Sequence, residues 1–129
     1  MTADRSTERI GPPLMAGERE MLRAFLDYHR ATLAMKCDGL SDADLRRQSM
    51  PPSTLSLLGL VRHMAEHAEV EQSRRIEADA PSLDALGHQA RWDQDVSLRL
   101  VMIHVLLEYA RHNGQADFLR GAIDGIVGA

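Results

Sequence analysis

A long run of helical periodicity, from Ser97 to Gly125, constrains the fold of this chain more than any other segment. Within it His104, Glu108 and His112 stand four residues apart, a spacing that stacks side chains along one stripe of a helix. Apolar residues share that stripe, so a carboxylate and an imidazole occupy positions where a helix normally buries leucine. A buried carboxylate is costly unless it is paired, hydrogen-bonded or bound to a cation. The segment therefore predicts a long helix that carries a polar site within an apolar core.

A metal ion would remove that cost, because neutral imidazole and carboxylate are ordinary ligands of zinc and its neighbours in the first transition row. Gln115 adds a polar group on the same face, one turn further on. The alternative for Glu108 and His112 is a surface hydrogen bond beside a packed histidine, since this spacing is common in helices rich in arginine and glutamate. His104 lies at the edge of the stripe and is the weaker candidate.

The composition favours an all-α fold. Hydrophobic residues make up 44% of the 129 residues and aromatic residues only 4%, a balance that favours helices over sheet. The net charge is −4 and the basic residues are scattered, which argues against nucleic-acid binding. No segment has the length of a membrane span, and the first residues lack the apolar core of a signal peptide. We therefore expect a cytoplasmic protein.

Three long helices are expected, near residues 17–37, 54–77 and 97–121, and no segment alternates over the length of a strand. Residues 1–16 carry Ser, Thr, Pro and Gly without periodicity. We expect them to form a flexible lead-in to a single domain of residues 17–129.

The connections between these helices carry capping and turn residues. Ser41, with Asp44 three residues on, predicts a short helical turn, and Ser53 or Thr54 is expected to cap the second long helix. Between residues 79 and 96 we expect a loop with at most one helical turn.

Cys37 is the only cysteine, which excludes an intramolecular disulfide, and a half-buried structural role is favoured over a nucleophilic one.

The core face of the second predicted helix indicates which of its two histidines is buried. Periodicity gives the second helix a core face of Leu57, Val61, Met64 and Ala68. It places His67 beside that face and His63 further round, which favours His67 as the buried histidine.

Gly114 interrupts the last helix at a cost of about 1 kcal/mol relative to alanine, and we expect close approach of a neighbouring helix there.

Three segments carry a family resemblance, namely GEREMLRAFLDYHRATLAMKCDGLSDADLRR at 17–47, PPSTLSLLGLVRHMAE at 51–66 and SLRLVMIHVLLEYARHNGQADFLRGAIDG at 97–125. Their most specific motifs are GLVRH, EYARHNG and AIDG. On these segments the chain resembles the DinB/YfiT-like superfamily of metal-dependent helical bundles. It is most similar to the DinB-like branch of unknown function that is related to mycothiol-dependent enzymes. The resemblance implies an all-α, DinB-like up-down helical bundle.

The resemblance also implies a metal site, built from one histidine of the second helix and two ligands four residues apart on the last. The matching positions are His63, Glu108 and His112, so the resemblance favours His63 where periodicity favours His67. It implies a divalent metal, with zinc favoured over nickel, iron or manganese. His104 stays outside the matched set.

Roles for neighbouring residues follow from the same resemblance. Gln115 is expected to orient a ligand or substrate, and Arg111 or Arg62 to pair with an anionic group of a cofactor. The chain departs from the family pattern at Gln115, where a histidine is commoner, and at Gly121, where a glutamate is commoner. Any role of these two positions around the metal is therefore altered in this chain.

The family normally places a further long helix between the histidine of the second helix and the start of the last helix. Only residues 64–96 are available here, so the third helix is expected to be missing. The loss would leave apolar surface uncovered, which a second copy of the chain can bury. We therefore expect a homodimer.

The resemblance implies a metal-dependent transferase or isomerase that acts on a small molecule with a low-molecular-weight thiol such as mycothiol, bacillithiol or glutathione. A metal held by two imidazoles and a carboxylate keeps open positions, at which a thiol binds as thiolate. The alternative is a non-catalytic metal-binding or metal-free helical dimer that acts as a ligand-binding or interaction module. A nuclease or DNA-repair role conflicts with the acidic charge balance.

Overall fold

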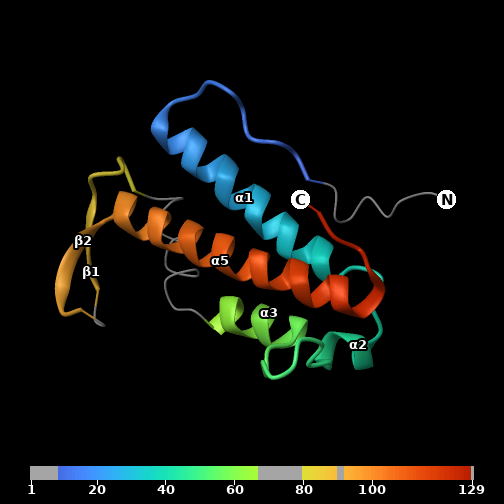
Figure 1. The fold of residues 1–129 in the computed structure, drawn as a ribbon. Helices are drawn as coiled ribbons and strands as arrows, with labels where there is room; N and C mark the ends of the chain where they lie inside the picture. The colour runs from blue at the N-terminus through green and yellow to red at the C-terminus, as the bar shows by residue number, and fades with distance from the viewer. Residues whose placement is uncertain (1–8, 67–79, 90–91, 129) are drawn as a thin grey trace.

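The computed structural model describes residues 9–66, 80–89 and 92–128 of the chain. Most of these residues are helical, as predicted (Figure 1). The elements in chain order are α1 (Glu18–Cys37), α2 (Asp42–Arg46), α3 (Leu57–Glu66), β1 (Leu86–Gln89), β2 (Gln94–Ser97) and α5 (Leu98–Asp124). The predicted first and last helices are therefore confirmed to within three residues at each end. The predicted end of the second helix, near residue 77, lies outside the described residues.

The main helices alternate in direction, as in an up-down bundle. Arg99 at the start of α5 bonds Glu18 at the start of α1, and Arg120 near the end of α5 bonds the backbone oxygen of Lys36 near the end of α1. These two helices therefore run parallel. Between them in sequence, α3 runs in the opposite direction along α5 (Figure 1).

The core lies where these three helices meet. Its buried apolar residues are Leu26 and Leu33 of α1, Leu57, Leu60 and Met64 of α3, and Leu98, Val101, Met102, Val105, Tyr109, Ala116 and Leu119 of α5, together with Leu83 before the sheet. On α3 the prediction of Val61 as a core residue is wrong, because its side chain is 37% exposed and Leu60 is buried instead. The buried face of α3 is thus rotated toward the side that carries His63.

The helix ends follow the capping chemistry of the sequence. Ser41 accepts a hydrogen bond from the N–H of Asp44 at 3.2 Å, and Ser97 accepts one from the N–H of Leu100 at 3.2 Å. Gly125, at φ 81°, ends α5 in the left-handed conformation that glycine adopts without strain.

The start of α3 differs from the prediction. Ser56 caps this helix by accepting from the N–H of Gly59 at 3.0 Å, so the predicted cap at Ser53 or Thr54 is wrong. Ser53 instead accepts from the N–H of Leu55 at 3.2 Å, a local turn that competes with helix formation.

A β-hairpin stands where a loop was expected, so the expectation of no paired strands is wrong. Its antiparallel register pairs Leu86 with Ser97 and continues into the N-terminus of α5, where the N–H of Leu98 bonds the oxygen of Ala85. The buried side chain of Leu83 anchors the hairpin to the core. The paired strands are four residues long and largely polar, so they show no apolar alternation that would have predicted them.

The close helix approach expected at Gly114 is not found among the described residues. A Cβ atom placed at this position meets no other atom within 4 Å. We therefore expect the Gly114→Ala substitution to stabilise the fold by about 1 kcal/mol, because alanine has the higher helix propensity. Urea unfolding followed by circular dichroism measures this change. The matched control is Gly125→Ala, which should destabilise the fold because the backbone at Gly125 is left-handed. A Gly114→Ala protein that is less stable than the parent would contradict the account.

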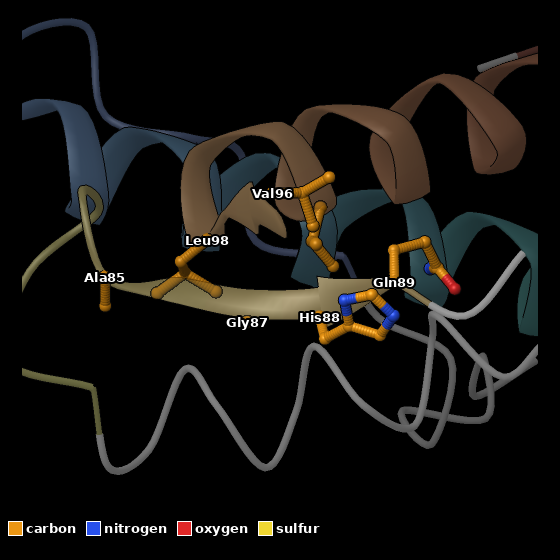
Figure 2. A pocket seen from close by; sticks show the side chains of 7 residues that line it. Ala85, Gly87, His88, Gln89, Val96 and Leu98 are labelled. Carbon is orange, nitrogen blue, oxygen red and sulfur yellow. The ribbon is translucent and has the colours of Figure 1, made fainter. Parts of the chain in front are cut away.

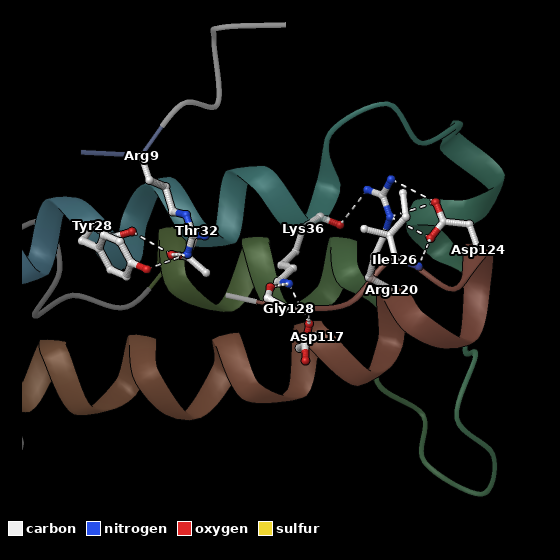
Figure 3. A network of polar contacts seen from close by, with 9 residues as sticks. All are labelled: Arg9, Tyr28, Thr32, Lys36, Asp117, Arg120, Asp124, Ile126 and Gly128. Carbon is white, nitrogen blue, oxygen red and sulfur yellow. Dashed lines mark hydrogen bonds and ion pairs between the residues drawn. The ribbon is translucent and has the colours of Figure 1, made fainter. Parts of the chain in front are cut away.

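Beneath the bundle surface, Lys36 is buried and donates to Asp117 at 2.6 Å and to the backbone oxygen of Gly128 (Figure 3). The hydrogen bond from Lys36, followed by one from the N–H of Gly128, lowers the pKa of Asp117 below its ordinary value of 3.8. The unfolded chain therefore binds more protons than the folded chain just below that pH.

The Lys36–Asp117 pair should make stability depend on pH. Its contribution is present above about pH 3.8 and disappears as the pH falls through the lowered pKa of Asp117. Asp117→Asn should be less stable than the parent at pH 6, and the difference should shrink on acidification. Unfolding curves from pH 6 to pH 2 measure this, with the exposed Asp42→Asn as control. A difference that is constant with pH would contradict the assignment.

Candidate metal centre

Three of the predicted site residues meet at the seam between α3 and α5. Glu108 and His112 lie one turn apart on α5, and His63 reaches them from α3. The Oε2 atom of Glu108 is 3.6 Å from Nε2 of His63 and 3.3 Å from Nε2 of His112. The two imidazole rings meet edge to face, with their centroids 4.7 Å apart.

These spacings fit a bound metal ion. Two ligand atoms at about 2.1 Å from a tetrahedral zinc ion are themselves about 3.4 Å apart. The carboxylate oxygen is close to this distance from each imidazole nitrogen, and one ligand atom from each residue lies within 4.8 Å of the others. The side chains therefore converge on a common point with little rearrangement needed.

Gln115 fixes the orientation of His112. Its Oε1 atom accepts a hydrogen bond from Nδ1 of His112 at 2.7 Å, so Nδ1 carries a proton. The other ring nitrogen, Nε2, faces Oε2 of Glu108 at 3.3 Å. A proton or a cation between these two atoms would offset the repulsion between their lone pairs. Hydrogen bonding at the far nitrogen is the usual way in which a protein holds a metal-binding histidine.

One side of the site is open. The side chain of His63 is 48% exposed, that of Glu108 24% and that of His112 13%. Because α5 supplies the more buried ligands and α3 the exposed one, solvent reaches the point of convergence from the His63 side. An ion held by these three side chains would keep a position for water or a substrate, as catalytic zinc sites do.

The other sequence candidates lie outside this triad. His104 packs its ring against Trp92, with centroids 5.6 Å apart, and contributes no atom to the cluster. Arg111 and Arg62 are exposed neighbours of the triad along α5 and α3. His67 lies outside the described residues.

Cys37 is half-buried at the end of α1, as expected for a structural cysteine. Burial raises the pKa of its thiol above the ordinary value, and the charge of Arg120 opposes this effect only in part. A raised pKa keeps the sulfur protonated at neutral pH, which disfavours nucleophilic attack.

Two hollows lie away from the triad. The crevice at the hairpin, lined by His88, Val96 and Leu98 among others, has a volume of about 10 Å³, room for a single water molecule (Figure 2). A larger cavity of about 210 Å³ lies between α1 and α5. Sequence reasoning missed it, although Tyr28, Thr32 and Lys36 place polar groups four residues apart on one side of α1.

Residues 21–69 and 66–125 match the family model described as mycothiol-S-transferase. No curated protein and no solved structure matches the chain. Among the described residues, none of the helices combines the length and the apolar character that crossing a bilayer requires.

Proposed function

Because the chain belongs to the mycothiol-S-transferase family, we propose that it is a metal-dependent transferase or isomerase that acts on a small molecule with the help of a low-molecular-weight thiol. The observation that carries the proposal is the convergence of His63, Glu108 and His112 at the spacing of metal ligands. Zinc is the favoured metal, ahead of nickel, iron and manganese, and mycothiol is the favoured thiol.

In this proposal the protein side chains bind and orient the reactants. A bound metal would supply a positive charge that stabilises the thiolate form of the thiol. His63, Glu108 and His112 would hold the ion, and Gln115 keeps Nε2 of His112 directed at it.

Arg111 and Arg62 are exposed and next in sequence to His112 and His63, and in this proposal they would pair with an anionic group of the thiol or the substrate. We assign no general acid or base.

The open His63 side also suits the alternative function, a metal-binding module without catalysis. A thiol-transfer assay separates the two. The untagged chain is loaded with zinc and mixed with mycothiol and an electrophile such as monobromobimane, and loss of free thiol is followed. We expect acceleration that is absent from a Glu108→Gln variant. A zinc-loaded chain that accelerates the reaction with neither mycothiol, bacillithiol nor glutathione would support the non-catalytic alternative.

We also propose a homodimer, because α5 carries an exposed apolar stripe. Leu100, Ile103, Leu107 and Phe118 share one side of this helix, and the last two are 62% and 71% exposed. Water contact with a stripe of this kind is unfavourable, and a second copy of the chain can cover it. A cytoplasmic location and a small-molecule substrate belong to the same proposal.

Light scattering on the purified chain at micromolar concentration tests the dimer. We expect twice the mass of one chain, and a Leu107→Glu variant should elute as a monomer. The control is Arg46→Glu, which introduces the same residue at an exposed position of α2, outside the stripe of α5. A parent chain that is already monomeric would contradict the proposal.

A further inference from the structure

The cavity between α1 and α5 has the features of a second binding site. Its volume of about 210 Å³ suits a small organic molecule, since an apolar cavity of about 150 Å³ can hold benzene. Asn113 and Gly114 form its wall on α5, next in sequence to His112 but on the side that faces α1, whereas His112 faces α3. From its charge, size and lining, we propose that this cavity binds a small organic monocarboxylate.

Arg9 supplies the charge that would recognise the carboxylate. Its Nη1 atom donates to the hydroxyl of Tyr28 at 2.9 Å and to Oγ1 of Thr32 at 3.2 Å, and its guanidinium lies 4.8 Å from the centre of the Tyr28 ring (Figure 3). Both partners are neutral, and among the described residues no carboxylate contacts Arg9. The planar guanidinium has further N–H groups, whose geometry matches a carboxylate.

The remaining charged groups of the cavity leave one net positive charge. Lys36 is paired with Asp117, so their charges cancel. His29 is neutral at pH 7, because burial, and then the charge of Arg9, lower its pKa below 6.5. The excess of one cation matches a monoanion better than a multiply charged phosphate.

Asn113 adds an unsatisfied polar group to the wall. Its Nδ2 atom donates to Nδ1 of His29 at 3.2 Å and to the backbone oxygen of His29 at 2.9 Å. Its Oδ1 atom is buried and has no hydrogen-bond partner among the described residues. Such atoms are rare in native proteins, because each one loses its hydration without compensation. Oδ1 is an acceptor, as a carboxylate is, so it would pair with a donor group elsewhere on the ligand, such as the hydroxyl of a hydroxy acid, and not with the carboxylate itself.

Gly114 and the Tyr28 ring shape the space for the organic part of the ligand. The position of Gly114 is open, since an added Cβ atom would meet nothing within 4 Å. The ring of Tyr28 offers an apolar wall beside the guanidinium. A carboxylate attached to a small ring or short chain supplies both an anion for the guanidinium and an apolar part for the open space. Inorganic phosphate supplies only the anion.

Isothermal titration calorimetry of the full zinc-loaded chain tests the ligand class with benzoate, lactate, benzamide and inorganic phosphate. We expect saturable binding of benzoate or lactate at one site per chain, and at least about tenfold weaker binding of neutral benzamide and of phosphate. Phosphate or benzamide binding as tightly as both carboxylates would overturn the assignment. So would the absence of carboxylate binding tighter than about 1 mM.

Variants locate the site. Gly114→Leu fills the cavity with a good helix former and should abolish carboxylate binding, whereas Ala110→Leu, one turn earlier on the exposed side of α5, should leave it unchanged. Arg9→Met should weaken binding about tenfold or more. Circular dichroism confirms that each variant is folded. Carboxylate binding that survives in both Gly114→Leu and Arg9→Met would place the ligand elsewhere, for example on the metal, and would overturn the inference.

Discussion

The His112→Ala variant should lose about 100-fold or more of its zinc affinity, because His112 is the most buried side chain of the proposed metal-binding triad and the one whose ring bonds Gln115. The substitution also leaves the partly buried carboxylate of Glu108 without one of its partners. We expect a loss of about 1–3 kcal/mol in the free energy of unfolding of the metal-free protein. Competition with a chromophoric chelator measures the affinity, and urea unfolding in the presence of EDTA measures the stability.

His104→Ala is the matched control, since His104 lies on the same helix two turns earlier, packs its ring against Trp92 and is not a member of the His63, Glu108 and His112 cluster. It should bind zinc as tightly as the parent. Equal zinc affinity in the His112→Ala variant and the parent would leave His112 with a structural role only.

The Arg120→Met substitution should destabilise the fold by about 3 kcal/mol. Arg120 is buried and donates to the backbone oxygen of Lys36 at 3.2 Å and to the carboxylate of Asp124 (Figure 3). It also donates to the backbone oxygen of Asp38 at 2.6 Å. The last carbonyls of a helix lack partners within the helix, so this guanidinium satisfies the end of α1 from α5. Methionine preserves much of the side-chain volume but none of the hydrogen bonds. Urea unfolding measures the loss.

Arg46→Met provides the control, because Arg46 pairs at 3.9 Å with Asp42 on the surface of α2 and such pairs add little to stability. A loss below about 1 kcal/mol in Arg120→Met would show that water replaces the guanidinium at the end of α1.

The helices could be predicted because their signals are local. Apolar spacing marked α1 and α5, and the start of α5 follows Ser97 as predicted, whereas its end, predicted near residue 121, lies at Asp124 before the left-handed Gly125. The hairpin could not be predicted, because its strands are short and polar and are stabilised by contacts with the start of α5. Ser53 and Thr54 were predicted as capping residues of the second helix, but Ser56 also carries a hydroxyl, and only the folded chain selects it.

The site could be predicted in part. The spacing of Glu108 and His112 marked two of its members, but periodicity ranked the two histidines of the second helix by burial. The histidine that the structure brings to the site, His63, has a side chain that is 48% exposed, so burial was the wrong criterion. The resemblance to a family identified His63, which the structure brings to the other two residues. The α1–α5 cavity had no comparable signal, because it depends on how two helices far apart in sequence pack.

Titration of the metal-stripped, untagged parent chain with zinc, in competition with a chelator of known affinity, tests the metal centre most directly. The account predicts about one zinc ion per chain, bound more tightly than about 1 µM. It also predicts that zinc raises the midpoint of thermal unfolding, because the ion binds the folded chain in preference to the unfolded one. A parent chain that binds no zinc at this affinity, with an unfolding midpoint that zinc does not change, would contradict the assignment of His63, Glu108 and His112 as a metal site.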